Sequence, residues 1–218
     1  MAEEQTAPLP LHIDIVSDVV CPWCVIGFKR LEQVLADNAG RFTVDISWHP
    51  FELNPRMPPE GQNLREHLVQ KAGITPEQSR TARARLTELG ESLGFTFRFR
   101  DEMRIGNTFR AHQLLHWAGE HGLQTELKLR LFSTYFAEDG WIDDPDTLVS
   151  AAVAVGLDGE TAAAVLADQR FADTVRSAER QWVEQGVQAV PAFVFNGRAA
   201  VLGAQEAAQF QRALDKAA

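Results

Sequence analysis

The sequence predicts an α/β fold in which a βαβ unit, a long helical segment and a ββα unit follow one another along 218 residues. Two segments near the N-terminus have β-type patterns and enclose a helical stretch that starts at a Cys-Pro-Trp-Cys motif. A proline-rich segment then opens more than 100 residues of helical character. An Asn-Gly turn finally joins two short β-type runs, which is the strongest short signal for a hairpin.

The first unit covers residues 11–48. Residues 11–16 predict a strand, and the following helix begins at Pro22, because proline suits the first helical position. An apolar stripe predicts its buried face, and a stop signal lies between Asn38 and Gly40. Residues 42–48 alternate apolar and polar side chains, which predicts a second strand with one covered face. The stripe consists of Cys24, Phe28, Leu31 and Leu35.

The middle of the chain is predicted to be helical. Proline-rich residues 50–59 interrupt regular structure, and helix-start signals then occur at five places. We therefore expect about five helices, and their starts lie near Leu64, Thr75, Asn107, Asp144 and Asp158.

The last unit begins after Gly186. Residues 192–195 and 198–202 flank the Asn196-Gly197 turn and predict a hairpin, and residues 204–217 predict a terminal helix. We expect an α/β domain made of residues 9–55 and 186–218, with residues 60–185 inserted into it as a helical domain.

Composition narrows the range of partners. The formal net charge of -9 argues against nucleic acid and against anionic membranes. No run of residues reaches the ~18 apolar positions that a membrane-spanning helix needs. The first residues lack the basic and apolar regions of a secretory signal, so we expect a cytoplasmic protein.

The only two cysteines, Cys21 and Cys24, have the spacing of a reversible redox dithiol. At the helix start, Cys21 lies beside unpaired backbone N–H groups and the positive end of the helix dipole. Its pKa is therefore expected below the ordinary value of about 8.5. Cys24 belongs to the buried stripe, so we expect an accessible Cys21 that attacks and a shielded Cys24 that resolves.

A metal site is not expected. Zinc needs four ligands, or three and water, and no second pair of cysteine or histidine ligands completes this motif. His112, His116 and Glu120 share one helix face, but a fourth ligand is lacking nearby, and such spacing is also common on wet helix faces.

The order of these elements resembles the thioredoxin fold of the DsbA family. Residues 14–27 resemble its FrnE-type branch, as do residues 48–55, 107–112, 186–193 and 203–205. Two positions depart from the pattern of this branch: Val25 stands where an aromatic residue is usual, and Gln113 stands where an arginine is usual. The resemblance implies a thioredoxin-like fold with a helical insertion, a cis Pro191 packed against the cysteines, and a Val190 backbone that pairs with a substrate strand.

The substrate-binding residues expected on this basis are Pro22, Trp23, Val190 and Pro191. Trp23 offers an apolar contact to a substrate. Because its side chain is neutral, it should stabilise the Cys21 thiolate less than an imidazolium would, so we expect an intermediate redox poise and not that of an extreme oxidant. Asp14 has two possible roles, either as a buried carboxylate that relays the proton of Cys24 or as a strand-end aspartate paired to a backbone N–H.

We therefore expect a thiol-disulfide oxidoreductase that oxidises, reduces or isomerises disulfides. It needs no bound cofactor, although glutathione could serve as redox partner. Its partners would be disulfide or dithiol substrates and a cellular redox partner, and the sequence does not indicate an oligomeric state. The alternative is a glutathione-dependent isomerase or transferase, because 2-hydroxychromene-2-carboxylate isomerases and kappa-type glutathione transferases use an Asn-Pro like Asn54-Pro55. Those enzymes carry serine in place of Cys21. A third possibility is a binding protein that uses its peptide groove without turnover.

Overall fold

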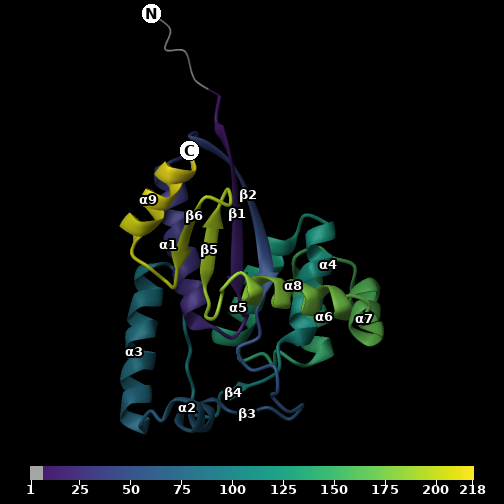
Figure 1. Cartoon of the computed structure of the whole chain (residues 1–218). Helices are drawn as coiled ribbons and strands as arrows, with labels where there is room; N and C mark the ends of the chain where they lie inside the picture. The colour runs from purple at the N-terminus through teal and green to yellow at the C-terminus, as the bar shows by residue number, and fades with distance from the viewer. Residues whose placement is uncertain (1–6) are drawn as a thin grey trace, which may run out of the picture.

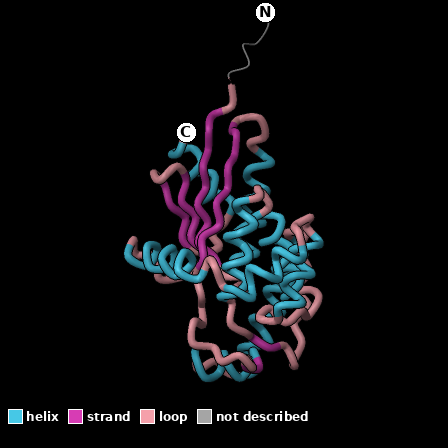
Figure 2. The backbone as a smooth tube through the Cα atoms, turned by 90° about the vertical axis from the view of Figure 1, so that its right-hand side faces the viewer, coloured by secondary structure: helices cyan, strands magenta, loops and turns pink. Residues whose placement is uncertain are grey.

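Four strands form a mixed sheet in the computed structural model, which describes residues 7–218 (Figures 1 and 2). The strand order is β2-β1-β5-β6, with β1 parallel to β2 and antiparallel to β5, and with β5 antiparallel to β6. Their bounds are Leu9–Ser17 for β1, Phe42–Pro50 for β2, Ala192–Phe195 for β5 and Ala199–Leu202 for β6. The predicted βαβ unit and C-terminal hairpin are confirmed.

Two helices belong to these units, α1 (Pro22–Asp37) and α9 (Ala207–Ala217), and they contact each other. They lie beside β5 and β6, whereas most other helices gather beyond β2 (Figure 1). The helices between β2 and β5 are α2 (Leu64–Ala72), α3 (Pro76–Ser92), α4 (Phe109–Glu120), α5 (Gln124–Phe136), α6 (Pro145–Ala154), α7 (Gly159–Asp168) and α8 (Ala172–Glu184). Two short strands, β3 (Gln62–Asn63) and β4 (Arg104–Ile105), pair in a separate small sheet.

Seven helices therefore stand between residues 64 and 184, where about five were expected. The expected starts correspond to α2, α3, α4, α6 and α7, and the two missed helices are α5 and α8. Both begin without a side-chain cap, since Leu123 and Phe171 occupy their N-cap positions. Neither start carries the Ser, Thr, Asp or Asn signal on which the prediction depended.

The hairpin has the backbone that its sequence requires. Asn196 and Gly197 both have positive φ angles, 49° and 64°, and the Arg198 N–H donates to the Phe195 carbonyl at 2.9 Å. Only glycine, and less readily asparagine, adopts this conformation without strain.

The second strand is less covered than predicted, because β2 lies at an edge of the sheet. Of its predicted apolar face, only Trp48 is buried, and Val44 is exposed. The Gln124 side chain covers one stretch of this edge: its Oε1 accepts from the Trp48 N–H at 2.9 Å, and its Nε2 donates to the Trp48 carbonyl at 3.0 Å. A side-chain amide thus replaces a neighbouring strand.

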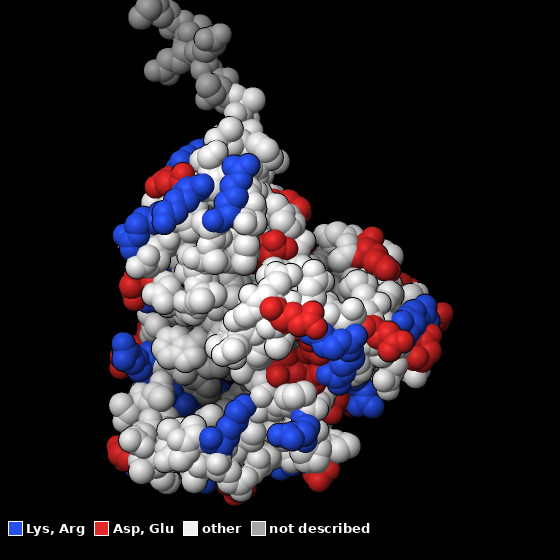
Figure 3. Space-filling view, in the orientation of Figure 1, with Lys and Arg blue, Asp and Glu red and all other residues white. Residues whose placement is uncertain are grey.

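One continuous hydrophobic cluster joins the sheet, α1 and α9 to the buried faces of the inserted helices. The expected domain boundaries near residues 55, 60 and 185 stay predictions, because this shared core does not separate the two parts. No helix within residues 7–218 is both long enough and apolar enough to cross a membrane. On the face in Figure 3, Lys and Arg gather over α9 and β6, and acidic side chains are most frequent on the side of the inserted helices.

Candidate redox site

Cys21 occupies the N-cap position of α1. Its backbone is extended, with φ -93° and ψ 110°, and Pro22 provides the first helical residue as predicted. The Cys21 N–H donates to the Asp18 carbonyl at 3.2 Å, and the Cys21 carbonyl accepts from the Cys24 N–H at 3.0 Å. Because the first N–H groups of a helix have no partner within it, this position favours a negative charge on the sulfur.

The loop before β5 lies against this helix start. The Val190–Pro191 peptide bond is cis, and the Cys21 Sγ lies 3.8 Å from the Val190 carbonyl oxygen. The Pro191 carbonyl accepts a hydrogen bond from the Gly203 N–H at 2.7 Å, which ties the loop to the end of β6. The structure thus brings Cys21, Val190 and Pro191 together from opposite ends of the chain.

Gly27 makes this close approach possible. A Cβ atom added at Gly27 would lie 2.9 Å from Cζ of Phe193 and 3.2 Å from Cγ of Pro191. Real side chains essentially never come as close as the first distance, so any other residue would push α1 away from the loop.

Both cysteines are free thiols, and both are buried: Cys21 is 4% exposed and Cys24 1%. The expectation of an accessible Cys21 is therefore wrong for the protein without a substrate, because the Val190 loop lies against the sulfur. Trp23, between the cysteines, is 43% exposed and offers a large apolar surface at the site. Burial and the neighbouring Cys21 thiol raise the pKa of Cys24 well above its ordinary value.

Three charged or polar side chains are buried close to the cysteines: Asp18, His112 and Lys128. The Asp18 Oδ2 accepts from the Leu53 N–H at 2.8 Å, and its Oδ1 lies 3.5 Å from the His112 Nε2. Burial alone would raise the pKa of Asp18, but pairing with His112, the Leu53 N–H and the charge of Lys128 together hold it below its ordinary value.

Lys128 lies on α5, and its side chain is 1% exposed. Its Nζ lies 5.3 Å from the ring centroid of Trp48 and 5.2 Å from that of Phe132. Burial lowers the pKa of Lys128 to about 8, against the opposing effects of Cys24, Asp18 and Cys21. Lys128 could not be predicted as a site residue from the sequence, because its helix was not predicted and a lone lysine on a helix usually faces water.

Asp14 does not have the relay position considered from the sequence. Its carboxylate accepts from His49 Nε2 at 2.7 Å and from His12 Nε2 at 3.2 Å, on the sheet surface. It does not take the second role either, because it lies within β1 and its partners are two histidine side chains instead of a backbone N–H. The buried carboxylate beside the cysteines is Asp18, which comes three residues before Cys21 in the sequence. That proximity was a signal the prediction could have used.

The remaining candidates have local roles. The Asn54 Oδ1 accepts from Lys71 Nζ at 2.8 Å and from His67 Nε2 at 2.9 Å, so it links its loop to α2. His116 packs on Phe171 with 4.9 Å between ring centroids, whereas His112 faces Asp18. Within residues 7–218, no three His, Cys, Asp or Glu side chains are arranged to hold a metal ion.

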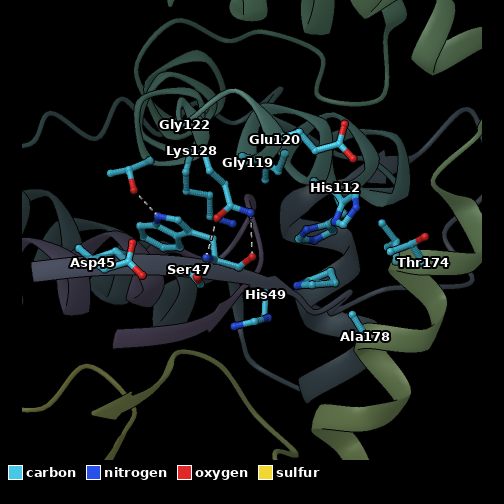
Figure 4. Close-up of a pocket in the computed structure, with 18 of the residues that line it drawn as sticks. Asp45, Ser47, His49, His112, Gly119, Glu120, Gly122, Lys128, Thr174 and Ala178 are labelled. Atoms are coloured by element: carbon cyan, nitrogen blue, oxygen red, sulfur yellow. Dashed lines mark hydrogen bonds between the residues drawn. The ribbon is translucent and has the colours of Figure 1, made fainter. Parts of the chain in front are cut away.

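A cavity of about 850 Å³ opens between β2, α4, α5 and α8 (Figure 4). Lys128 and His112 reach into it from the helices, and His49 of β2 lies at its border, where its ring packs on Trp182 with 4.7 Å between centroids. Thr174 and Ala178 of α8 line the opposite wall. The cavity therefore contacts two members of the buried charged group, although neither cysteine lines it.

Comparisons with known proteins show the family to which this chain belongs. A family model described as a DSBA-like thioredoxin domain matches residues 12–215. The crystal structure of a probable DsbA oxidoreductase from Streptomyces coelicolor has a TM-score of 0.90 at 36% sequence identity, covering 95% of this chain and 89% of that one.

Two further proteins extend the likeness. The uncharacterized protein YwbO of Bacillus subtilis is 28% identical over 207 residues, covering 94% of this chain and 96% of that protein. A 2-hydroxychromene-2-carboxylate isomerase shares the fold alone, with a TM-score of 0.68 at 14% identity and 94% of each chain covered. The fold is the thioredoxin-like DsbA fold with a helical insertion, and the Cys-Pro-Trp-Cys pair opens its first helix. This chain belongs to the DsbA-like thioredoxin domain family.

Proposed function

We propose that this protein is a thiol-disulfide oxidoreductase in which Cys21 attacks and Cys24 resolves. The observation that carries the proposal is the position of Cys21 at the start of α1, with its sulfur 3.8 Å from the Val190 carbonyl oxygen. A helix N-terminus favours the thiolate, and the loop beside it offers backbone groups to an extended substrate.

The reaction has two steps. The Cys21 thiolate attacks one sulfur of a substrate disulfide, forms a mixed disulfide and releases the first substrate thiolate. The Cys24 thiolate then attacks Cys21 Sγ, forms the Cys21–Cys24 disulfide and releases the second substrate thiolate. Two electrons pass to the substrate, and the reverse sequence oxidises a substrate dithiol.

Burial supports this division of roles. Cys24 has the raised pKa and the lower exposure, so it is a protonated reserve thiol at rest. Trp23 and Pro22 supply the apolar docking surface, and the Val190 and Pro191 backbone supplies hydrogen-bonding groups. As parts of the same proposal we include membership of the FrnE-type branch, a cytoplasmic location and glutathione as a redox partner.

The glutathione-dependent isomerase is the weaker candidate. The side-chain oxygen of Asn54 is already bound by His67 and Lys71, and a cysteine stands where those enzymes carry serine. Both features favour a dithiol reaction over binding of glutathione as an isomerase cofactor.

The test is the catalysed reduction of insulin disulfides by the wild type, Cys21→Ser and Cys24→Ser. We expect turnover by the wild type, no turnover by Cys21→Ser, and accumulation of a mixed disulfide by Cys24→Ser. Equal activity of the Cys21→Ser variant would overturn the proposal. Isomerisation of a small hydrophobic substrate by the same variant would favour the glutathione-dependent alternative.

A further inference from the structure

The edge strand β6 directs main-chain groups into open space. Residues of an antiparallel pair alternate between hydrogen-bonded and open positions, and the Gly203 N–H donates to the Pro191 carbonyl at 2.7 Å. The main-chain groups of Leu202 and Ala200 therefore point away from β5. The Gln205 side chain agrees with this direction, because its Nε2 donates to the Leu202 carbonyl at 2.9 Å, and no other side chain of residues 7–218 bonds this edge. An extended segment can therefore add to the sheet beside β6.

A groove of about 500 Å³ runs along this edge, between β6 and α9. Residues 198–202 form one wall, and side chains of α9 and of the segment before it form the other. Five residues of a strand span about 17 Å, so the groove has the length of a short added strand. Leu202, at one end, is 63% exposed and offers an apolar contact. The opposite wall consists of Gln205, Gln209, Arg212, Ala213 and Lys216.

The charged side chains of this groove are all cations, namely Arg198, Arg212 and Lys216. Within the described residues 7–218, no Asp or Glu lines the groove and none of the three cations has an acidic partner, whereas Arg41 is paired with Asp215 of α9 at 2.7 Å. Figure 3 shows Lys and Arg gathered over α9 and β6, on a chain whose formal net charge is -9. The groove therefore favours a negatively charged occupant.

Charge and main chain together narrow the choice of occupant. A second β6 is disfavoured, because its own cations would lie against these, and cations at a strand edge commonly prevent such self-pairing. The acidic helices of another copy would match the charge but leave the strand edge unpaired, because the main chain of a helix is bonded within the helix. Nucleic acid would be attracted to the cations but has no peptide groups to pair with a strand. An acidic segment in extended conformation satisfies both requirements.

We infer that β6 and α9 form a docking groove for an extended acidic segment of a partner protein, which pairs with the main chain of Ala200 and Leu202 as an added strand. Successive side chains of a strand point to opposite faces, so every second side chain of the segment meets α9. Acidic residues at these alternate positions reach Arg212 and Lys216. The Gln205 amide, which bonds the Leu202 carbonyl in the free protein, moves aside when the segment binds.

The groove ends next to the candidate redox site. Leu202 is followed by Gly203, whose N–H binds the Pro191 carbonyl, and the preceding Val190 carbonyl oxygen lies 3.8 Å from the Cys21 sulfur. A partner held along β6 is thereby brought near the cysteines. The inference goes beyond the proposed function, because docking by main-chain pairing and charge does not depend on whether Cys21 reacts.

The experiment uses the full-length reduced protein and a sulfur-free probe, an acetylated and amidated hexapeptide in which glutamate and threonine alternate. Titration followed by NMR gives the affinity, and amide hydrogen exchange shows which main-chain groups become protected. We expect the peptide to slow exchange of the Ala200 and Leu202 N–H groups at least about tenfold. Exchange at Ala199 and Val201 should stay unchanged, because by the same alternation their main-chain groups already bond to β5.

Variants separate the charge of the groove from its strand edge. Reversing two charges in Arg212→Glu/Lys216→Glu should weaken peptide binding at least about tenfold, because attraction is replaced by repulsion. The matched control, Arg85→Glu/Arg180→Glu, makes the same change in net charge at exposed positions of α3 and α8 and should stay within about twofold of the wild type. Ala200→Pro removes an outward N–H and keeps all groove charges, and it should also weaken binding at least about tenfold.

Several results would overturn the inference. Unprotected Ala200 and Leu202 N–H groups in the wild type at about 1 mM peptide would do so without any variant, which keeps the test decisive should Ala200→Pro not fold. Equal loss of binding in the two double variants would mean that net charge alone attracts the peptide. Binding of an oligothymidylate as tight as that of the peptide would assign the groove to nucleic acid. Dimerisation of the wild type that Ala200→Pro abolishes would assign the edge to a second copy of this chain.

Discussion

Asp18 is the residue on which the buried charged group depends. Its side chain is fully buried, one oxygen accepts the Leu53 N–H, and the other lies 3.5 Å from His112. It thereby links the start of α1, the loop after β2 and α4. Removing one partner of a buried charged pair leaves the other uncompensated.

Asp18→Asn should lower the free energy of unfolding near pH 7 by about 3–5 kcal/mol. The pKa of Asp18 is lowered in the folded protein, so its stabilising contribution is fully present above the unfolded value of about 3.9 and is lost as pH falls through the folded value. The difference in the free energy of unfolding between Asp18→Asn and the wild type should therefore become smaller below about pH 4.

Denaturant unfolding at a series of pH values checks this expectation. Asp37→Asn, at an exposed position of α1, is the control and should stay near the wild type throughout. A difference between Asp18→Asn and wild type that stays constant down to low pH would mean that Asp18 is not held ionised by its neighbours.

At the same scale, the sequence predicted the position of the cysteines at the helix start but not the side chains that surround them. Cys21, Cys24 and Pro22 lie within one motif, so local rules apply to them. Lys128 reaches the site from a helix more than 100 residues away, and only tertiary packing decides which face of that helix meets the cysteines. No periodicity in one sequence contains that information.

Among the elements, α1 is placed by how closely it can approach the loop before β5. Gly27→Ala should therefore destabilise the protein by about 1–3 kcal/mol through overlap with Phe193 and Pro191. This outcome opposes helix propensity, which favours alanine over glycine by about 1 kcal/mol. The same variant should slow disulfide exchange, because a displaced α1 moves Cys21 relative to Val190.

Gly119→Ala on α4 is the matched control. A Cβ atom there would have its nearest neighbour, Cδ of Gln124, at 3.5 Å, which is an ordinary van der Waals contact. Only the higher helix propensity of alanine should then affect stability, so the variant should be as stable as the wild type or slightly more stable. Thermal unfolding and exchange rates measured side by side settle the point. Equal stability of the two variants would refute the steric role assigned to Gly27.

The helices show why prediction succeeds unevenly at this scale. Thr75, Asp144 and Asp158 accept hydrogen bonds from the first turns of their helices, and each of those starts was predicted. The helices α5 and α8 begin without such a cap and owe their stability to packing. The covered face of β2 was overestimated for a related reason, since alternation does not reveal which strand lies at the edge.

In the whole molecule, one hydrophobic core serves both the sheet and the inserted helices. A protein with a single core is expected to unfold in one cooperative transition. Trp48 in the sheet and Trp117 in the insertion should therefore report the same midpoint as far-UV circular dichroism.

Single-tryptophan variants that keep only Trp48 or only Trp117 provide the two local probes. Coincident transitions are expected in denaturant. Two separate midpoints would mean that the predicted parts, residues 60–185 and the remainder, are independent folding units despite their shared core.

The central claim is that Cys21 and Cys24 divide the reaction between them. Mass spectrometry of the mixed disulfide formed with glutathione disulfide tests it most directly, using Cys24→Ser and Cys21→Ser in parallel. We predict that Cys24→Ser accumulates glutathione on Cys21, because nothing resolves that intermediate, and that the buried Cys24 of Cys21→Ser reacts at least about tenfold more slowly. Faster modification of Cys24 than of Cys21 would contradict the account.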